Sequence, residues 1–165
     1  QVITIHDNTE TASLLRAIAK PVTEFGSDKL VQLIDRLFKI MRETNGAGLS
    51  APQIGVSERI FVYGFDFNPR YPDAPAVPKT IVINPEILWK SEETAEYEEG
   101  CLSVPNKRGF VTRHKWVIFS TMDINGIVHE KTVTEFEARI VQHEIDHLNG
   151  VLFADRAKVL RDSTL

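Results

Sequence analysis

The sequence has a single cysteine, Cys101, among its 165 residues. One cysteine cannot form an intrachain disulfide, so a reducing compartment is expected. No apolar run approaches the roughly 20 residues that cross a bilayer. The first 20 residues lack the basic start and apolar block of a secretory signal. These absences predict a cytoplasmic protein that has no membrane partner.

An excess of basic charge is also missing. The chain has 19 Lys and Arg against 23 Asp and Glu, a net charge of -4, and its basic residues are scattered. Direct nucleic-acid binding is therefore not expected. The length and a hydrophobic content of 42% are ordinary for a globular protein. We interpret residues 1–165 as a single domain with a sizeable core.

Helical periodicity is clearest in residues 27–46, where apolar side chains recur three and four positions apart. Ser27 is the expected N-cap of this helix and Gly46 its expected stop. A shorter helix is expected over residues 13–20, because Pro21 would end it.

Strand patterns occupy the middle of the chain. Residues 58–65 and 79–88 are rich in Ile, Val and Phe and are predicted as strands. Residues 66–78 lie between them, contain four of the eight prolines, and are predicted as an extended loop. Residues 111–134 alternate in polarity and contain Asn125-Gly126, a strong hairpin signal.

The chain becomes helical again over residues 134–150. Thr134 and Glu137 match a capping box, and Gly150 fits the C-terminal stop. The order of all these elements favours an α+β fold. We expect mainly antiparallel β-sheets packed around this central C-terminal helix, with further helices at the N-terminus.

The C-terminal helix carries the sequence His143-Glu144-Ile145-Asp146-His147. Residues four apart stand on one helix face, so the two histidines can bind one metal ion. Glu144 points about 100° away around the helix, where it is poorly placed to be a ligand but can reach a water on the metal. Two ligands and a general base form the HExxH pattern, and a helix with incidental histidines is the alternative.

The spacing leaves the third ligand and the reaction open. Phe153 stands where metzincin proteases have a third histidine, and no glutamate follows Glu144 to act as in thermolysin-like proteases. Cys101 is the other candidate, because a thiolate is a strong ligand. A Cys-His-His set leaves a fourth position for water, as catalytic sites do. A buried structural cysteine and a Cys-His nucleophile pair are the alternatives, and the second leaves Glu144 unexplained.

Three segments resemble, in order, the signature motifs of the peptide deformylases. They are GAGLSAPQ at residues 46–53, EGCLS at residues 99–103 and HEIDH at residues 143–147. The resemblance extends over nearly the whole chain. Ser50 stands where the family usually has alanine, a change between small residues that is expected to have little effect. The loop at residues 66–78 is longer than in compact members of the family.

This resemblance implies that Cys101, His143 and His147 hold one divalent metal ion. Ligand type alone would favour zinc, whereas the resemblance implies iron(II), with zinc, nickel or cobalt able to substitute. The implied reaction is hydrolysis of the N-terminal formyl group from the formylmethionine of newly synthesised polypeptides, with release of formate. The implied enzyme is a peptide deformylase, an amide hydrolase that acts on linear amides.

The resemblance also assigns roles in this reaction. Metal-bound water would be the nucleophile and Glu144 the general base and then acid, while the Gln53 side chain and the Leu102 N–H would stabilise the oxyanion. The peptide itself would contact further residues, which are Gly46, Ala47, Gly48, Glu99, Gly100, Arg108, Phe136 and Ile140.

N-formylated nascent peptides are the implied partners. Docking to the ribosome is compatible with this activity, and a monomer is expected. The implied location is the bacterial cytoplasm, with an organellar stroma or matrix as the alternative. Two other functions stay open from the residues alone: a metallopeptidase with the same ligands, and a non-catalytic, metal-stabilised module that binds chain termini. A structural site should have four protein ligands, and only three can be named here.

Overall fold

The computed structural model describes residues 1–163. Among them, no helix is both long and apolar enough to cross a membrane. The elements in chain order are α1 (Thr9–Ala12), the 3-10 helix η1 (Ser13–Leu15), α2 (Asp28–Glu43), β1 (Gly48–Ser50), the 3-10 helix η2 (Ala51–Ile54), β2 (Ile60–Phe65), β3 (Val77–Lys90), β4 (Thr94–Cys101), β5 (Val104–His114), β6 (Trp116–Met122), β7 (Val128–Thr134), α3 (Glu135–Leu148), α4 (Phe153–Arg156) and β8 (Leu160–Asp162).

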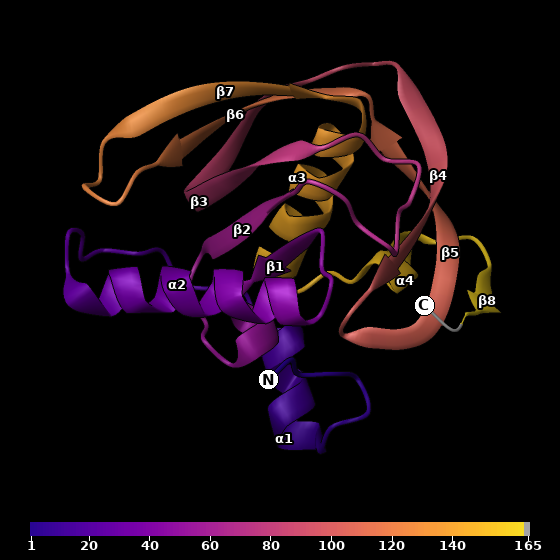
Figure 1. The fold of residues 1–165 in the computed structure, drawn as a ribbon, viewed down its shortest axis with the longest axis horizontal. Coiled ribbons are helices and arrows are strands. Elements are labelled where there is room, and N and C mark those ends of the chain that lie inside the picture. Colours follow the sequence, from indigo (N-terminus) through magenta and orange to yellow (C-terminus); the bar gives the residue numbers. More distant parts are fainter. Residues whose placement is uncertain (164–165) are drawn as a thin grey trace.

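The strands form two sheets (Figure 1). One has five strands in the order β1-β2-β3-β6-β7, and the other has three in the order β4-β5-β8. Each pairing between these strands is antiparallel. The expected α+β fold with mainly antiparallel sheets is therefore confirmed.

Both faces of the five-stranded sheet are covered at β2. Successive strand residues point to opposite faces, and the residues of β2 divide between two cores accordingly. Phe61 and Tyr63 lie in the core that includes α3 residues such as Val141. Ile60 and Val62 lie in the core that includes the buried residues of α2, which are Leu30, Ile34, Leu37 and Met41.

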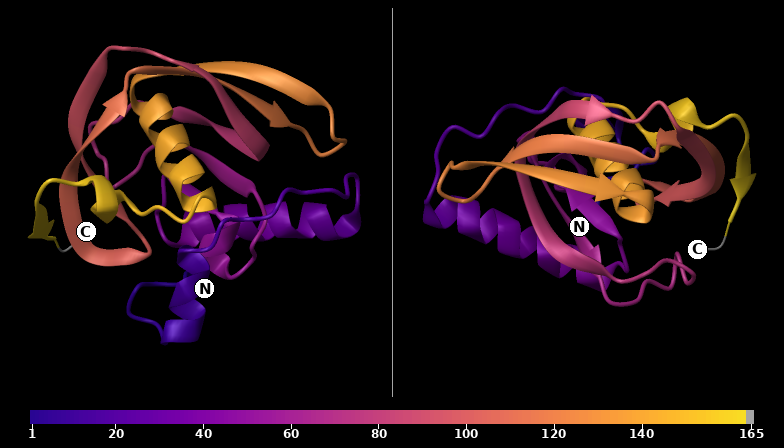
Figure 2. Two further views of the ribbon diagram at one scale, coloured as in Figure 1. Left: turned by 180° about the vertical axis from the view of Figure 1, so that it is seen from behind. Right: turned by 90° about the horizontal axis from the view of Figure 1, so that it is seen from above.

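Helix α3 is central in the fold, as predicted. The views in Figures 1 and 2 place it inside the curve of the two sheets, with α2 on the other side of β1 and β2. Nine of its 14 residues are buried, including polar ones. A helix enclosed in this way can present buried polar side chains to an internal site.

The predicted ends of the helices are partly confirmed. Ser27 caps α2, since its side chain accepts a hydrogen bond from the Leu30 N–H. The expected stop at Gly46 is wrong: Asn45 adopts the left-handed conformation there, with φ of 57°. Gly150 does follow α3 with φ of 75°, as expected.

The capping box predicted at the start of α3 is absent, because the Thr134 side chain makes no capping hydrogen bond. Glu137 instead accepts a hydrogen bond from the Tyr63 hydroxyl at 2.7 Å. The helix expected over residues 13–20 is also displaced. Helical structure runs from Thr9 to Leu15, because the Asn8 side chain caps its start by accepting from the Thr11 N–H.

The predicted strands are present, but one predicted segment is divided between the two sheets. Residues 58–65 and 79–88 contain β2 and most of β3, and the Asn125-Gly126 hairpin joins β6 to β7. The alternating segment at residues 111–134 is not one hairpin, however. Its first residues belong to β5 in the other sheet, and the chain changes sheets at Lys115. No turn residue marks this change, so the alternation conceals it.

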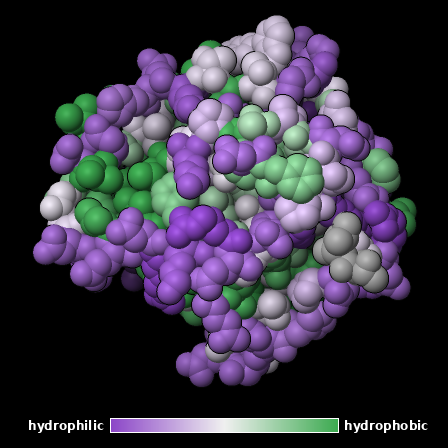
Figure 3. All heavy atoms as spheres, viewed as in Figure 1, coloured by the Kyte–Doolittle hydropathy of each residue, from purple (hydrophilic) through white to green (hydrophobic). Residues whose placement is uncertain are grey.

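The face seen in Figure 3 is mostly hydrophilic. Apolar side chains gather at the left of this view, where Figure 1 places the end of the β6–β7 hairpin. Exposed apolar residues of that hairpin are Ile124, Ile127 and Val128.

Candidate metal centre

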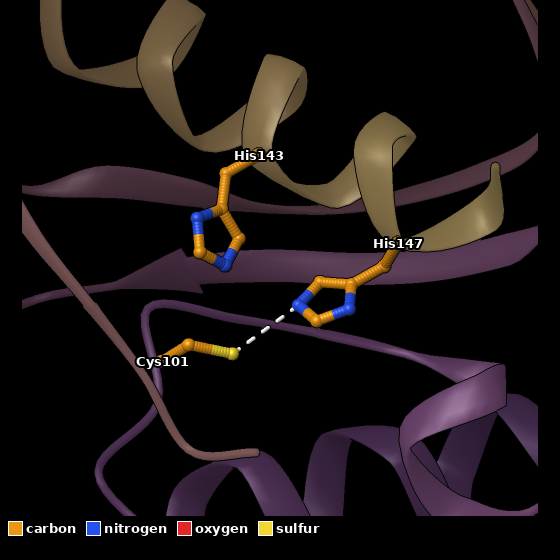
Figure 4. Close-up of side chains that lie close together, drawn as sticks. All are labelled: Cys101, His143 and His147. Atoms are coloured by element: carbon orange, nitrogen blue, oxygen red, sulfur yellow. Dashed lines mark hydrogen bonds between the residues drawn. The ribbon is translucent and has the colours of Figure 1, made fainter. Parts of the chain in front are cut away.

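Three side chains converge beneath α3. Cys101, at the end of β4, points toward His143 and His147 of α3 (Figure 4). One ligand atom from each of the three lies within 4.8 Å of the others, and Cys101 Sγ is 3.3 Å from His147 Nε2. The structure therefore brings together the three residues that the sequence predicted as metal ligands.

The local chain path explains where the thiol points. β4 and β5 form a hairpin whose turn is Leu102 and Ser103, and their register shifts between Gly100 and Cys101. Such an irregularity re-aims the side chain at the end of a strand. Cys101 is 4% exposed, so its thiol lies in the interior of the protein.

The surroundings favour the thiolate form of Cys101. Burial raises the pKa of the thiol, but the charges and hydrogen bonds of His147 and His143 outweigh it and hold that pKa well below its usual value. The thiolate is the form of cysteine that binds metal ions.

The His143 ring is held by a carboxylate. Its Nδ1 donates a hydrogen bond to Oε1 of Glu99 at 3.0 Å, which leaves Nε2 to face the cysteine side. Arg113 donates to both oxygens of Glu99, at 2.9 and 3.0 Å. Burial raises the pKa of Glu99, but the bonds from His143 and Arg113 outweigh it and bring the pKa to about 2. Glu99 is therefore ionised at neutral pH, and its carboxylate orients a candidate ligand.

Asp146, inside the HEIDH motif, extends this network. Its carboxylate accepts from Arg113 at 2.7 Å and from Arg156 at 2.6 Å. Asp146 thus links α3 to β5 and α4. These contacts give Asp146 a structural role.

Glu144 is buried beside the candidate ligands. It is 4% exposed, and its Oε1 makes no hydrogen bond within the described residues. Burial raises the pKa of Glu144 more than the charges of His143 and His147 lower it. A buried carboxylate with a raised pKa and a free oxygen is suited to accept and return a proton.

Gly48 makes room for this carboxylate. A Cβ on Gly48 would lie 2.9 Å from Oε2 of Glu144, closer than such atoms pack. Glycine at position 48 of the loop thus leaves space for the carboxylate of Glu144, the general-base candidate, because a larger residue would displace it.

The Gln53 amide is held in one orientation. Its Oε1 accepts from the backbone N–H and the hydroxyl of Ser50, both at 3.0 Å. Its Nε2 donates to Ser103 Oγ at 3.1 Å and lies 3.7 Å from Cys101 Sγ. The amide N–H group therefore faces the thiolate side. The Ser50 hydroxyl contributes to this orientation, a role that its small size did not suggest.

A cavity of about 40 Å³ opens beside these groups. Most residues predicted to contact the reacting groups or the peptide line it, namely Ala47, Gly48, Gln53, Glu99, Gly100, Leu102, Phe136, Ile140 and Glu144. Arg108 instead lines a neighbouring cavity. Gly46 packs behind the site, where a Cβ would lie 3.1 Å from Leu102 Cδ1.

Several residues at the site were not predicted. Arg70 and Tyr71 of the proline-rich loop and Arg139 of α3 also line the cavity. The loop had no sequence signal for contact with the site. Arg139 is one position before Ile140 on the helix, and arginine there suggests a solvated face. Arg113 lies in a predicted strand, where nothing marks an arginine as buried.

The residues present fit a divalent metal ion. A sulfur and two imidazole nitrogens converge at ligand distances of one ion and leave a fourth position. Glu144 Oε1, beside these ligands, is buried without a hydrogen-bond partner within the described residues. Buried polar atoms usually have a partner, so this oxygen is free to accept a hydrogen bond from a group bound at the fourth position.

Comparisons with known proteins agree on one family. The profile of the polypeptide deformylases matches residues 1–163. Peptide deformylase 2 of Ralstonia nicotianae is 47% identical over 146 residues, which are 88% of this chain and 82% of that protein. Peptide deformylase 2 of Pseudomonas putida is 48% identical over 145 residues, which are 87% of this chain and 81% of that protein.

Solved structures show the same likeness. The class I type b peptide deformylase of Acinetobacter baumannii, bound to Met-Ala-Ser, superposes with a TM-score of 0.88 at 43% identity, covering 94% of this chain and 96% of the other. An inhibitor complex of the Plasmodium falciparum peptide deformylase superposes with a TM-score of 0.80 at 37% identity, covering 96% and 89%. With its motifs, its fold and a profile match over nearly its whole length, the chain belongs to the polypeptide deformylase family.

Proposed function

We propose that Cys101, His143 and His147 hold the one divalent metal ion of this enzyme and that Glu144 carries the proton in its reaction. The protein is a hydrolase that removes the N-terminal formyl group from newly synthesised peptides, the activity of its family. The single observation that carries the residue assignment is the convergence of three ligand atoms within 4.8 Å, beside a buried carboxylate whose Oε1 has no hydrogen-bond partner in residues 1–163.

When bound at the three ligands, a divalent ion supplies Lewis-acid chemistry, which polarises a carbonyl oxygen and makes a water molecule more acidic. Glu144 takes a proton from the attacking water. It then returns that proton to the leaving nitrogen of the peptide, and formate and a free amino terminus result. The raised pKa of Glu144 supports this role, because a base must release the proton that it accepts.

The negative charge that develops on the formyl oxygen needs donors. Gln53 Nε2 and the Leu102 N–H are assigned this role. The orientation of the Gln53 amide supports it, because Ser50 holds the amide oxygen away from the thiolate side. Donors that are fixed before the reaction need no reorganisation as charge develops.

The lining of the cavity supports selectivity for a formyl group. A formyl carbon bears only hydrogen, so close packing by Gly48, Gln53 and Leu102 beside the nucleophile would exclude larger acyl groups. The methionine side chain would pack on the apolar residues Ala47, Phe136 and Ile140, which line the same cavity.

Iron(II) is proposed as the native ion, with zinc, nickel or cobalt able to replace it. A mixed thiolate and imidazole set is compatible with these first-row metals. Residues 1–165 are proposed to act as one monomeric catalytic domain on N-formylated nascent peptides, with or without ribosome docking. The proposed location is the bacterial cytoplasm, with an organellar stroma or matrix as the alternative.

Formate release from formyl-Met-Ala-Ser, measured on anaerobically purified protein together with its metal content, tests these assignments. Glu144→Gln should keep the fold and the metal but lose at least about 100-fold in kcat. Glu130→Gln, an exposed carboxylate on β7, is the matched control and should retain activity. Full activity in Glu144→Gln would overturn the general-base assignment. Cleavage of internal bonds in unformylated peptide would instead indicate a metallopeptidase.

A further inference from the structure

Three arginines surround the path that leads away from the metal centre. Arg70 and Arg139 line both the small cavity and a second cavity of about 420 Å³ that shares residues with it. Arg108 lines the second cavity. A Cβ on Gly100 would lie 3.2 Å from Arg70 Nη2 and 3.4 Å from Arg108 Nη1. The guanidinium groups of Arg70 and Arg108 therefore both lie beside Gly100, the residue before Cys101 on β4.

The proline-rich loop holds Arg70 in this place. The buried Asn68 donates to the Asn45 carbonyl at 2.9 Å and accepts from the Arg70 N–H at 2.8 Å. The Tyr71 hydroxyl accepts from the Gly100 N–H at 3.0 Å. These bonds fix the loop on both sides of Arg70, so this arginine is a positioned group at the mouth of the site.

Arg108 is buried with one nitrogen unused. It is 5% exposed, its Nη2 donates to the Arg70 carbonyl at 3.0 Å, and its guanidinium stacks over the Tyr71 ring. Its Nη1 has no hydrogen-bond partner within the described residues. The same is true of Nε of the partly buried Arg139, whose Nη2 donates to the Glu98 carbonyl. Buried donors without partners are costly unless a ligand or water meets them.

The acidic residues nearby do not neutralise Arg70 and Arg139. Glu98 forms an ion pair with Arg161 and has a longer contact of 3.5 Å with Arg108 Nε. Glu99 forms its ion pairs with Arg113 and His143 and acts on Arg139 only through a longer-range charge interaction.

Glu135 and Asp73 also line the second cavity. Glu135 lies 3.9 Å from Lys115, which pairs more closely with Glu93 at 3.2 Å. Asp73 is exposed on the loop and screened by solvent. Among the described residues, neither Arg70 nor Arg139 forms an ion pair with these carboxylates, so both guanidinium groups remain available to a ligand.

We infer that Arg70 and Arg139, with the buried Nη1 of Arg108, form a subsite that favours an acidic side chain at one of the two positions that follow methionine in the formylated peptide. Arginine presents donors in a fork that matches a carboxylate. This inference rests on the proposed function, because the subsite lies along the path from the reacting centre. It assigns a specificity-determining role to the long loop at residues 66–78.

The test compares kcat/KM for peptides that differ only in one charge. Formyl-Met-Glu-Ser and formyl-Met-Ala-Glu, both as C-terminal amides, are paired with the same peptides carrying Gln for Glu. We expect about a three- to ten-fold preference for Glu in at least one pair, falling as salt is raised. Arg70→Gln combined with Arg139→Gln should bring that ratio close to one. Arg36→Gln, an exposed arginine of α2 that lines a different cavity, should keep the preference.

The outcomes separate the two proposals. Equal turnover of the Glu and Gln peptides in both pairs would overturn the acidic subsite while leaving the proposed function intact. A preference that survives the Arg70→Gln, Arg139→Gln double variant would overturn the assignment to these arginines. No turnover of any formylated peptide by fully metallated protein would count against the proposed function itself.

Discussion

Oε1 of Glu99 lies 3.0 Å from Nδ1 of His143 and accepts a hydrogen bond from its N–H group. The two residues are 44 positions apart in the sequence, one on β4 and the other on α3. The bond fixes the tautomer of the ring, because Nδ1 carries the proton and Nε2 is left with its lone pair for a metal ion.

We predict that Glu99→Gln weakens metal binding by about ten- to 100-fold, since a neutral amide orients and polarises the imidazole less than a carboxylate does. Competition with a chelator, followed by metal analysis of the protein, measures this. Glu96→Gln is the matched control, because Glu96 lies on the same strand but pairs with the exposed Lys158. Equal metal retention by Glu99→Gln and the parent would contradict the prediction.

Gly48→Ala should lower kcat while the metal stays bound. The added methyl group would lie 2.9 Å from Glu144 Oε2, and the carboxylate must shift to avoid it. A misplaced general base loses on the order of ten- to 100-fold in rate. Steady-state kinetics, metal content and thermal unfolding on one sample separate this effect from misfolding. Unchanged kcat would mean that Glu144 acts from another position.

Ser50→Ala should lower kcat/KM by about three- to ten-fold, because the Gln53 amide loses one of the two donors that hold its oxygen. The effect should vanish when Gln53 is already replaced by Ala, since the serine then has no amide to orient. A double-mutant cycle measures this coupling. Additive losses in the double variant would show that Ser50 acts by another route.

Arg113→Met should lower the free energy of unfolding by about 3–5 kcal/mol, because it leaves the buried carboxylates of Glu99 and Asp146 without their shared partner. Urea unfolding at equal metal loading measures the change. Lys158→Met is the control for loss of an exposed ion pair and should leave stability nearly unchanged. A small effect of Arg113→Met would mean that water enters and solvates the two carboxylates.

Local periodicity was enough to predict part of the site. His143 and His147 share a helix face because they are four residues apart, and the same geometry turns Glu144 aside from the ligand position. The strands at residues 58–65 and 79–88 were equally readable, since β-branched and aromatic residues mark them. Each of these features depends on residues close together in the chain.

Local periodicity could not predict the change of sheet at Lys115 or the left-handed conformation of Asn45. A strand that leaves one sheet and enters another keeps its alternation, because both sheets bury one face. Asn45 takes the place expected for Gly46 because asparagine also tolerates positive φ. In both cases more than one conformation suits the local sequence, and packing selects between them.

The amino-acid sequence alone was enough to predict the helix that carries two histidines and a glutamate, to leave Cys101 as the third candidate ligand, and to show the motifs shared with the polypeptide deformylases. The bracing of His143 by Glu99 and Arg113, and the place of Arg70 at the site, follow from the tertiary structure. These contacts join residues on different elements, whereas the Ser50–Gln53 contact is a local capping box that spans three positions. Pairing between elements depends on sheet register and loop packing, which local periodicity does not encode.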